Sequence, residues 1–410
     1  MNNISDNNDW TESCLSDIAL INPRETIKKG STSKSVAMEK LVPYCRKIDG
    51  FELKAFKGGT KFRNQDTLLA RITPCLENGK TAYVDILEDG EIGFGSTEYI
   101  VIRPKEGLSD SKFLYYFSIS PRFREEAIKL MTGTSGRQRV QTDQIVSKIF
   151  AFPKLPEQKA IAAILTSFDD KIELLRQQNQ TLEEMAQTLF KEWFVDFRFP
   201  GVGKMIDSEL GLIPEGWRVN GFLDLFNLLS GGTPKTSKEE YWNGKIKWVS
   251  AKDITPNHRK FILETEKSIT QLGLKKSATK LLPEYTVVIS ARGTVGNYCL
   301  LSEPMCISQS NYGVRSKNDK LVFYTYLAVG NQIETLKSQA YGSVFDTITT
   351  STFKGLSVIC PPLDILISFE KIIDPLFKKI MHNFIQIQTL TQLRDSLLPK
   401  LMSGEVRVLT

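Results

Sequence analysis

Ile161-Ala-Ala-Ile-Leu165-Thr-Ser-Phe168-Asp-Asp-Lys-Ile172-Glu-Leu-Leu175 begins a repeat of apolar residues that continues to Trp193. The apolar positions are separated alternately by four and three residues, and Asn179 fills the one gap in the pattern. This heptad spacing is typical of an α-helix whose apolar face lies in a coiled-coil seam. We therefore predict a long helix over residues 156–198, which would extend about 60 Å at a rise of 1.5 Å per residue.

The same pattern returns further along the chain, again after prolines. Pro153 and Pro156 precede the first helix, and Pro361-Pro362 precede the second. The second pattern has polar exceptions at Asn383 and Arg394, and its apolar positions are Phe369, Ile373, Leu376, Ile380, Ile387, Leu390, Leu397 and Leu401. Because two helices of equal register stabilise each other, a helix pair is favoured over two helices buried separately in globular cores.

An antiparallel pairing places the polar seam residues of the two helices opposite each other. With the helix midpoints aligned, Asn179 faces Asn383 and Leu175 faces Ile387. A parallel pairing would put Asn179 against Ile387 and leave two buried amides unsatisfied. We expect Arg394 either to contact a partner or to mark a frayed end. The predicted seam residues are Leu165, Phe168, Ile172, Leu175, Asn179, Leu182, Ile373, Leu376, Ile380, Asn383, Ile387 and Leu390.

The regions before the two helices are also similar to each other. Trp10 to Ile18 returns as Trp217 to Leu225, and Phe152-Pro153 returns as Cys360-Pro361. Ala70-Arg71-Ile-Thr73 returns at an offset of 221 as Ala291-Arg292-Gly-Thr294, and Ser96-Thr-Glu-Tyr99 returns at an offset of 213 as Gln309-Ser-Asn-Tyr312. Two copies of a globular unit, each followed by a helix, predict a pseudo-twofold molecule. Such a molecule suits a pseudo-symmetric partner, of which duplex DNA is the commonest.

Each globular region has short strands between turn signals, which predicts an α+β fold with two β-rich domains. Strands are expected at residues 67–72, 81–86, 99–103, 286–290 and 356–360, and helices at 112–130 and 321–338. We predict a first domain at 1–155, a first spacer helix at 156–198 and a loop-like linker at 199–212. A second domain at 213–362, a second spacer helix at 363–404 and a tail at 405–410 follow.

Composition is that of an ordinary soluble protein: 41% of the 410 residues are hydrophobic and 24% are charged. No apolar run is long enough to cross a membrane, and Met1 to Asp9 has no export-signal pattern. Six cysteines without a Cys-x-x-Cys pair indicate reduced thiols, so we expect a cytoplasmic protein. The basic charge lies in the globular regions, at +3 for residues 1–155 and +5 for 201–362, whereas residues 156–200 carry −3. A polyanion would therefore meet the globular regions.

Catalytic patterns are not found in the sequence. The chain has two histidines, which argues against a histidine metal site or a catalytic triad. Gly201-Val-Gly-Lys204 lacks the spacing and the Ser/Thr of a phosphate loop. Asp169-Asp170 is interpreted as a pair of acids that complement a helix dipole. We expect no metal, no cofactor and no catalysis in this chain.

Sequence readout of DNA requires Arg, Lys, Asn, Gln or Ser/Thr side chains on loops held by a rigid scaffold. The basic, glycine-containing loops of both regions provide such residues. The candidates are Lys57, Thr60, Lys61, Arg63, Asn64, Arg71, Arg137 and Arg139 in the first domain, and Thr233, Lys235, Lys238, Lys252, Lys275, Lys276 and Arg292 in the second. Because Arg71 and Arg292 recur at corresponding strand ends, we expect them to serve the framework or to contact phosphates.

Several segments resemble the specificity (S) subunits of type I restriction-modification systems. They are Gly232-Thr-Pro-Lys-Thr-Ser-Lys-Glu-Glu-Tyr-Trp242, Trp248-Val-Ser-Ala-Lys-Asp253, Pro153-Lys-Leu-Pro-Glu-Gln158 and Leu397-Leu-Pro-Lys-Leu-Met-Ser-Gly-Glu405. The resemblance implies two target recognition domains, each of which reads one half of an asymmetric two-part DNA site. It also implies two modification subunits that methylate adenine from S-adenosylmethionine, and restriction subunits that use ATP and Mg. The chain itself would bind none of these cofactors.

Three alternatives remain open at this point. The chain could be the recognition subunit of a related type II-like system whose partner fuses a nuclease to a methyltransferase. It could be a coiled-coil adaptor without a role in DNA binding, which would show no salt-sensitive retention of duplex DNA. A stand-alone methyltransferase would need a methyl-donor motif, which we do not find.

Overall fold

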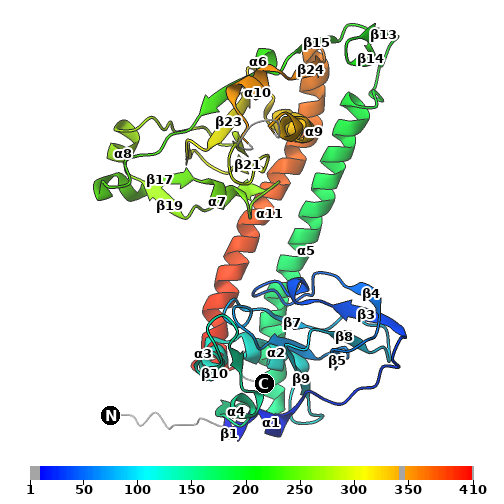
Figure 1. The fold of residues 1–410 in the computed structure, drawn as a ribbon, viewed down its shortest axis with the longest axis vertical. Coiled ribbons are helices and arrows are strands. Elements are labelled where there is room, and N and C mark those ends of the chain that lie inside the picture. The colour runs from blue at the N-terminus through cyan, green and yellow to red at the C-terminus, as the bar shows by residue number, and fades with distance from the viewer. Residues whose placement is uncertain (1–9, 341–346, 409–410) are drawn as a thin grey trace. The chain divides into compact units, whose positions relative to one another are not determined.

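Contacts divide the chain into two compact units, each of which combines a globular domain with segments of two long helices (Figure 1). The computed structural model describes residues 10–340 and 347–408. Unit 1 comprises residues 1–173 and 388–410, and unit 2 comprises residues 174–387. Residues 1–9, for which we expect no export signal, lie outside the described residues. No helix of the described chain combines the length and apolar character needed to traverse a bilayer.

The domain of unit 1 is built mainly from short strands. Their bounds are β1 Thr11–Cys14, β2 Ala19–Ile21, β3 Thr32–Val36, β4 Glu52–Ala55, β5 Thr60–Phe62, β6 Thr67–Ala70, β7 Thr81–Tyr83, β8 Gly93–Gly95, β9 Tyr99–Pro104, β10 Met131–Thr132, β11 Arg139–Val140 and β12 Ile149–Phe152. The helices are α1 Leu15–Ile18, η1 Met38–Lys40, α2 Ser111–Ile119, α3 Pro121–Lys129 and α4 Thr142–Val146. One sheet has the order β2-β9-β6-β7 and another the order β4-β3-β8-β5. The pairs β1-β12 and β10-β11 complete the domain.

The domain of unit 2 repeats this plan. Its strands are β13 Met205–Ser208, β14 Gly211–Pro214, β15 Arg218–Gly221, β16 Phe226–Ser230, β17 Trp242–Val249, β18 Phe261–Ile262, β19 Lys267–Ile269, β20 Val287–Ser290, β21 Tyr298–Leu301, β22 Cys306–Ile307, β23 Asn311–Ser316 and β24 Ser357–Cys360. The helices are α6 Phe222–Leu225, η2 Glu239–Tyr241, α7 Ala251–Ile254, α8 Gln271–Lys275, α9 Val322–Ala340 and α10 Thr350–Lys354. The order β16-β23-β20-β21 matches β2-β9-β6-β7 of unit 1, with β18 added beside β21. The order β19-β17-β22 matches β4-β3-β8 without a counterpart of β5, and the pair β15-β24 corresponds to β1-β12. The predicted α+β fold of two β-rich domains is confirmed.

The register of the matching strands corrects one part of the sequence comparison. Val140 donates its N–H to the carbonyl of Arg71, and Ile348 donates in the same way to Ala291. Tyr99 pairs with Ala70, as Asn311 pairs with Ser290. The true offsets are therefore 220 and 212, each one residue less than the predicted 221 and 213. Because strand side chains alternate between faces, the prediction that Arg71 and Arg292 are equivalent is wrong.

Two smaller expectations also change. The helix predicted over residues 112–130 is divided, because Ser120 caps α3 and accepts the N–H of Phe123 at 3.4 Å, with Pro121 in the first helical position. The linker predicted to be loop-like contains the hairpin β13-β14, in which Ile206 pairs with Ile213. Ile213 is buried while its neighbour Leu212 is exposed, so an alternating pattern was present in the sequence.

The two long helices are α5, Leu155–Phe194, and α11, Leu363–Ser403 (Figure 1, green and orange to red). In unit 1, Ile161 and Leu165 near the start of α5 share a core with Leu398 and Leu401 near the end of α11. In unit 2, Phe194 near the end of α5 lies 4.7 Å from Phe369 near the start of α11, between ring centroids. The helix segments therefore run antiparallel in each unit, as predicted.

Most of the predicted seam is buried. Leu165, Ile172, Leu175, Ile373 and Ile380 are at most 5% exposed. Phe168, Leu182, Leu376, Ile387 and Leu390 are half-buried. Phe377, which the heptad count did not include, is 2% exposed instead of its neighbour Leu376, because it fills a stack against Phe323 at 4.7 Å. Packing against the globular domain therefore buries Phe377 in place of Leu376, so the buried face of α11 is shifted by one residue from the predicted coiled-coil seam.

Two polar contacts lie inside the helix pair. In unit 2 the Nδ2 of Asn383 donates to the Oδ1 of Asn179 at 2.8 Å, which confirms the predicted pairing. In unit 1 the Nη1 of Arg394 donates to the Oδ1 of Asp169 at 2.6 Å, and both side chains are 7% exposed. Arg394 neither marks a frayed end nor lies open to a partner, so both expectations for it are wrong. Asp169 is a buried ion-pair partner and does not serve mainly as a helix-dipole acid.

Candidate nucleic-acid interface

One group of candidate residues in unit 1 gathers around the hairpin β10-β11. Arg139 on β11 donates from Nε and Nη2 to the carboxylate of Glu98, at 2.7 to 3.0 Å. The Nε of Arg71, just after β6, lies 3.8 Å from the same carboxylate. Hydrogen bonds from Arg139 hold the pKa of Glu98 below its ordinary value, although burial opposes this. The Glu98 carboxylate therefore forms ion pairs with both arginines beside the end of the paired strands β6 and β9.

The tip of this hairpin presents polar groups to solvent. Thr134, Ser135 and Arg137 are exposed there. Gly133 and Gly136 have φ values of 127° and 77°, which a residue with a Cβ adopts only with strain. The base is held by a 2.6 Å hydrogen bond from Gln141 to Thr132. A fixed base with a polar tip has the form required of a groove-reading loop.

A second group in unit 1 lies around β5. Thr60 and Lys61 line an open cleft of about 430 Å³ together with Arg24. The backbone at Gly59 lies so close to β8 that a Cβ there would be 2.3 Å from the carbonyl oxygen of Gly95. Glu98 follows Gly95 by three residues, so the turn from β8 to β9 links this group to the arginine pair. Lys57 is exposed in the same segment.

Two candidates of this group have structural partners. The side-chain amide of Asn64 donates to the carbonyl of Leu87 at 2.7 Å and accepts its N–H at 3.0 Å, so it closes a loop. Arg63 is half-exposed and pairs with the buried Glu25 at 2.6 Å. Both residues therefore have framework contacts that compete with any contact to DNA.

In unit 2 the glycine-rich loop after β16 is fixed by two tryptophans. The indole N–H of Trp248 donates to the carbonyl of Gly232 at 2.9 Å, and that of Trp242 donates to the carbonyl of Lys235 at 3.2 Å. Thr233 is hydrogen-bonded to Gln309. A Cβ at Gly232 would lie 2.4 Å from the backbone nitrogen of Thr279, so this loop lies against the segment that follows α8.

The remaining candidates of unit 2 are exposed lysines and one arginine. Lys275 and Lys276 at the end of α8 precede the segment that touches Gly232, which brings them near the glycine-rich loop; Lys235 and Lys238 in that loop are also exposed. Lys252 on α7 lies 3.8 Å from Glu266. A 2.9 Å hydrogen bond between Thr255 and Thr294 connects the end of α7 to the loop that carries the exposed Arg292. The candidates of this domain thus fall into two neighbourhoods.

Sequence reasoning missed the acidic and amide partners of these groups. In the sequence, Glu98 stands out only as part of the repeated Ser-Thr-Glu-Tyr segment, and Gln309 only as part of its copy. Their offset alignment carried no signal that an acid would face Arg139, since that contact joins residues 41 apart in the chain. Gln309 is a candidate reading residue because it touches Thr233 in an exposed loop.

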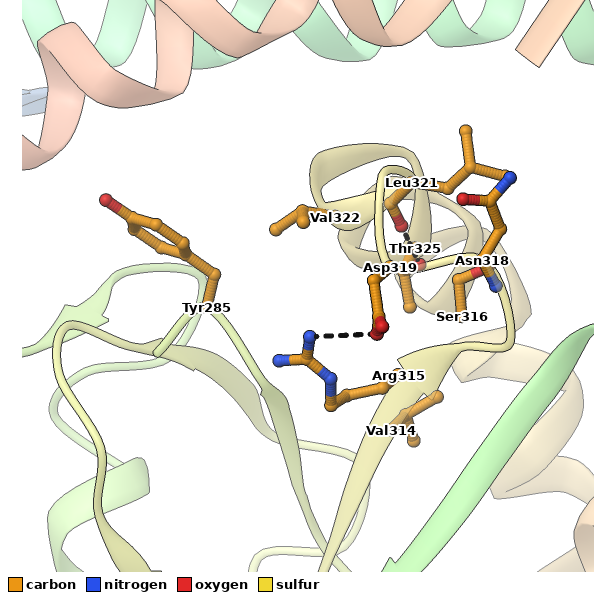
Figure 2. Close-up of a pocket in the computed structure, with 9 residues that line it drawn as sticks. All are labelled: Tyr285, Val314, Arg315, Ser316, Asn318, Asp319, Leu321, Val322 and Thr325. Carbon is orange, nitrogen blue, oxygen red and sulfur yellow. Dashed lines mark hydrogen bonds and ion pairs between the residues drawn. The ribbon is translucent and has the colours of Figure 1, made fainter. Parts of the chain in front are cut away.

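Three features outside these groups bear on possible chemistry in the chain. Within residues 10–340 and 347–408, no three His, Cys, Asp or Glu side chains lie together in a way that could hold a metal ion. Figure 2 shows a hollow where Arg315 forms a 3.3 Å ion pair with Asp319 beside Tyr285. Its volume is about 10 Å³, room for about one water and for no substrate. The Nδ1 of His258 accepts the N–H of Tyr298 at 3.2 Å, which is a structural role.

Glu98→Gln is expected to raise the affinity of the protein for random duplex DNA about three- to tenfold at low salt, because it removes a negative charge and releases Arg139 and Arg71 for phosphates. Electrophoretic mobility shift at several salt concentrations would measure this, with a steeper salt dependence expected. Glu334→Gln on α9 is the matched control, since Glu334 is exposed and pairs with Lys337. Equal effects of the two substitutions would show that the arginine pair does not face DNA.

Comparisons with known proteins agree with this arrangement. The family described as type I restriction modification DNA specificity domain matches residues 7–184 and again residues 214–397. The type I restriction enzyme HindI specificity subunit of Haemophilus influenzae is 26% identical over 97% of this chain and 100% of its own length. The MjaIX specificity subunit of Methanocaldococcus jannaschii is 28% identical over 75% of this chain and 71% of its own.

A similar fold is known from a crystal structure of a type I restriction-modification S subunit of M. genitalium. The TM-score is 0.63 at 16% sequence identity, over 98% of both chains. The duplicated domains and the double match of the family agree with each other. The chain belongs to the family of type I restriction modification DNA specificity domains, and it is a DNA specificity subunit, not an enzyme.

Proposed function

We propose that each domain reads one half of an asymmetric two-part site in duplex DNA, while α5 and α11 set the gap between the halves. The observation that carries this proposal is that the two domains share the central order of their sheets but differ at the sheet edges and in the candidate reading groups. Where unit 1 has Arg139 bound to Glu98, the corresponding position in unit 2 is Thr347. Unit 2 instead has the glycine-rich loop fixed by Trp242 and Trp248. A common framework with different reading groups suits two different half-sites.

The proposal extends to the complex in which this chain would act, in the cytoplasm where the DNA lies. Two modification subunits would dock on the helices and domains and methylate adenine from S-adenosylmethionine. Restriction subunits would use ATP and Mg for translocation and cleavage, and this chain would bind none of these cofactors. Exposed apolar side chains on the two helices support the docking of partner proteins there, namely Ile164, Leu174, Met185, Ile372, Ile385 and Leu393.

Exchange of one domain tests the division of labour. Residues 1–155 would be replaced by the first domain of another family member, and methylated adenines in host DNA would be mapped by single-molecule sequencing. We expect one half-site to change completely while the other half and the gap stay the same. The reciprocal exchange of residues 213–362 is the control and should change the other half. A change in both halves after either exchange would contradict the proposal.

A recognition subunit of a related restriction system remains the second candidate, because the same framework would serve both. The genes next to this one distinguish them: separate modification and restriction genes support the type I assignment, and one fused nuclease-methyltransferase gene supports the alternative. A coiled-coil adaptor predicts no salt-dependent retention of duplex DNA.

A further inference from the structure

Four buried polar residues in the seam of the two long helices have apolar counterparts at the corresponding positions. The helices begin at Leu155 and Leu363, and the strands before them end at Phe152 and Cys360, so corresponding positions are 208 residues apart. Each helix contributes one asparagine and one charged residue to the buried seam, namely Asn179 and Asp169 on α5, and Asn383 and Arg394 on α11. The seam is therefore asymmetric although the helices are copies of each other.

The charged contact lies in unit 1 and is part of a larger network. Asp169 accepts hydrogen bonds from Arg394 at 2.6 Å and from the hydroxyl of the buried Tyr116 at 2.7 Å. Arg394 also contacts Asp395 on its own helix at 2.8 Å. Burial alone would lower the pKa of Arg394, but the Asp169 carboxylate reverses this and raises it. Asp169 on α5 and Arg394 on α11 each have their buried counter-ion on the other helix.

The amide contact lies in unit 2 and is equally buried. Asn179 is 7% exposed and Asn383 is fully buried. They share one hydrogen bond of 2.8 Å, while the Nδ2 of Asn179 and the Oδ1 of Asn383 have no partner. The single bond is all that compensates the burial of two amides, so its loss would leave both without a protein partner.

Apolar residues occupy the positions that correspond to these four. Phe377 corresponds to Asp169, and Ala186 corresponds to Arg394. Ile387 corresponds to Asn179, and Leu175 corresponds to Asn383. In unit 2, Phe377 stacks on Phe323 at 4.7 Å and meets Tyr326 at 5.3 Å, so an aromatic cluster stands where unit 1 has its ion pair.

We propose that Asp169, Arg394, Asn179 and Asn383 form a pairing code, which makes α5 a partner for α11 and excludes a second copy of either helix. Only the α5–α11 pair brings the two charges together and the two amides together. Any pairing of identical helices in the same register separates all four. The buried face of α5 is therefore complementary to the buried face of α11. Neither face is complementary to a second copy of itself.

Pairing of two α5 helices shows the consequence. Each Asp169 would face Ala186 of the other copy and keep only Tyr116 as a partner. Each Asn179 would face Leu175 and find no amide. Because the arrangement is twofold, every defect would occur twice. A buried charge without its counter-ion is strongly destabilising, whereas a paired one is not.

Pairing of two α11 helices has corresponding defects. Arg394 would meet Phe377 and keep only Asp395, whose side chain is 56% exposed. Asn383 would meet Ile387. Both kinds of identical pair therefore lack the Asp169–Arg394 ion pair and the Asn179–Asn383 hydrogen bond. This discrimination does not depend on which DNA sequence the domains read.

The test uses the full chain with a protease site in place of the exposed residues 202–204, cut after folding. The nicked protein and its ¹⁵N-labelled copy would be unfolded together in urea, refolded by dilution, and analysed by native mass spectrometry. Pairs that contain one ¹⁵N-labelled half and one unlabelled half would show that the halves had separated before they refolded. We expect mixed pairs of the two different halves in roughly hundredfold excess over identical pairs. Without a code, about half of all pairs would be identical ones.

Substitutions of the four residues distinguish their effect from other causes of a preference for mixed pairs. Replacing each residue by its counterpart, as Asp169→Phe, Arg394→Ala, Asn179→Ile and Asn383→Leu together, should bring identical pairs close to the random proportion. Asn383→Leu alone is the milder version, and it should increase identical pairs by a smaller factor, because it removes the buried amide that opposes pairing of two C-terminal halves. Lys171→Ala with His382→Ala, on exposed positions of the same helices, is the control and should change nothing.

Two results would overturn the proposal. One is a near-random mixture of pairs from the unsubstituted nicked chain. The other is a preference for mixed pairs that stays the same in the Asn383→Leu variant, because the discrimination would then come from the globular domains.

Discussion

Arg394→Met is expected to lower the free energy of unfolding of unit 1 by about 3–5 kcal/mol, because it leaves the buried Asp169 carboxylate without its counter-ion. Arg394 and Asp169 are both only 7% exposed, so water cannot take over the role of the guanidinium. Hydrogen exchange followed by mass spectrometry would measure the loss in peptides from α2 and the start of α5. Peptides from the domain of unit 2 serve as an internal reference.

Arg198→Met is the matched control for this experiment. Arg198 also forms an ion pair, with Glu192 at 3.4 Å, but its side chain is 70% exposed. Its loss should change the free energy of unfolding by less than about 1 kcal/mol. Combining Arg394→Met with Asp169→Asn should recover part of the stability, because no uncompensated charge then remains. If Arg394→Met cost no more than the control, the buried ion pair would not stabilise unit 1.

Lengthening both helices by one heptad is expected to widen the gap between the half-sites by about three base pairs, because seven residues add about 10 Å of helix and a base pair rises 3.4 Å. A second copy of residues 175–181 would follow Thr181, and a second copy of residues 381–387 would precede Met381. The added segments again face Asn179 with Asn383 and Leu175 with Ile387. Mapping of methylated adenines would show the new gap.

Insertion into α5 alone is the control for the lengthened protein. It would shift every later seam residue of α5 past its partner in α11, so we expect loss of folding and no new gap. An unchanged gap after the double insertion would mean that the helices do not act as the spacer. A loss of both half-sites would mean that the domains depend on the helices for more than their spacing.

The helix pair could be predicted from the sequence because heptad spacing and two asparagines are local signals. The Asn179–Asn383 contact followed from aligning the midpoints of two helices of similar length. The Asp169–Arg394 contact did not, because the expectation that Asp169-Asp170 complements a helix dipole is wrong: Asp169 lies fourteen residues after Leu155, the first residue of α5, beyond the first turn. Phe377 was missed for a related reason, because the aromatic side chains of the neighbouring domain determine which face of α11 is buried.

The candidate interface was predicted only in outline. Glycine-containing basic loops were visible as segments, and the structure places several of them next to each other. The partners of individual residues were not visible, because Glu98 reaches Arg139, and Asn64 reaches Leu87, through contacts that depend on the folded sheet. The slip of one residue in the comparison of Arg71 with Arg292 has the same origin. Similar residues in two copies can be aligned even when the loops between them differ in length. The hydrogen bonds between strands show which residues are equivalent.

The core of unit 1 has a consequence for the synthesis of the protein. Ile161 and Leu165 are covered by Leu398, Leu401 and Met402, and Arg407 reaches Glu157 at 2.7 Å. The core of unit 1 therefore cannot be completed until residues 398–407 have been synthesised. Until then the apolar face at the start of α5 lacks its cover, and we expect a chain that stops before Leu398 to be sensitive to proteases.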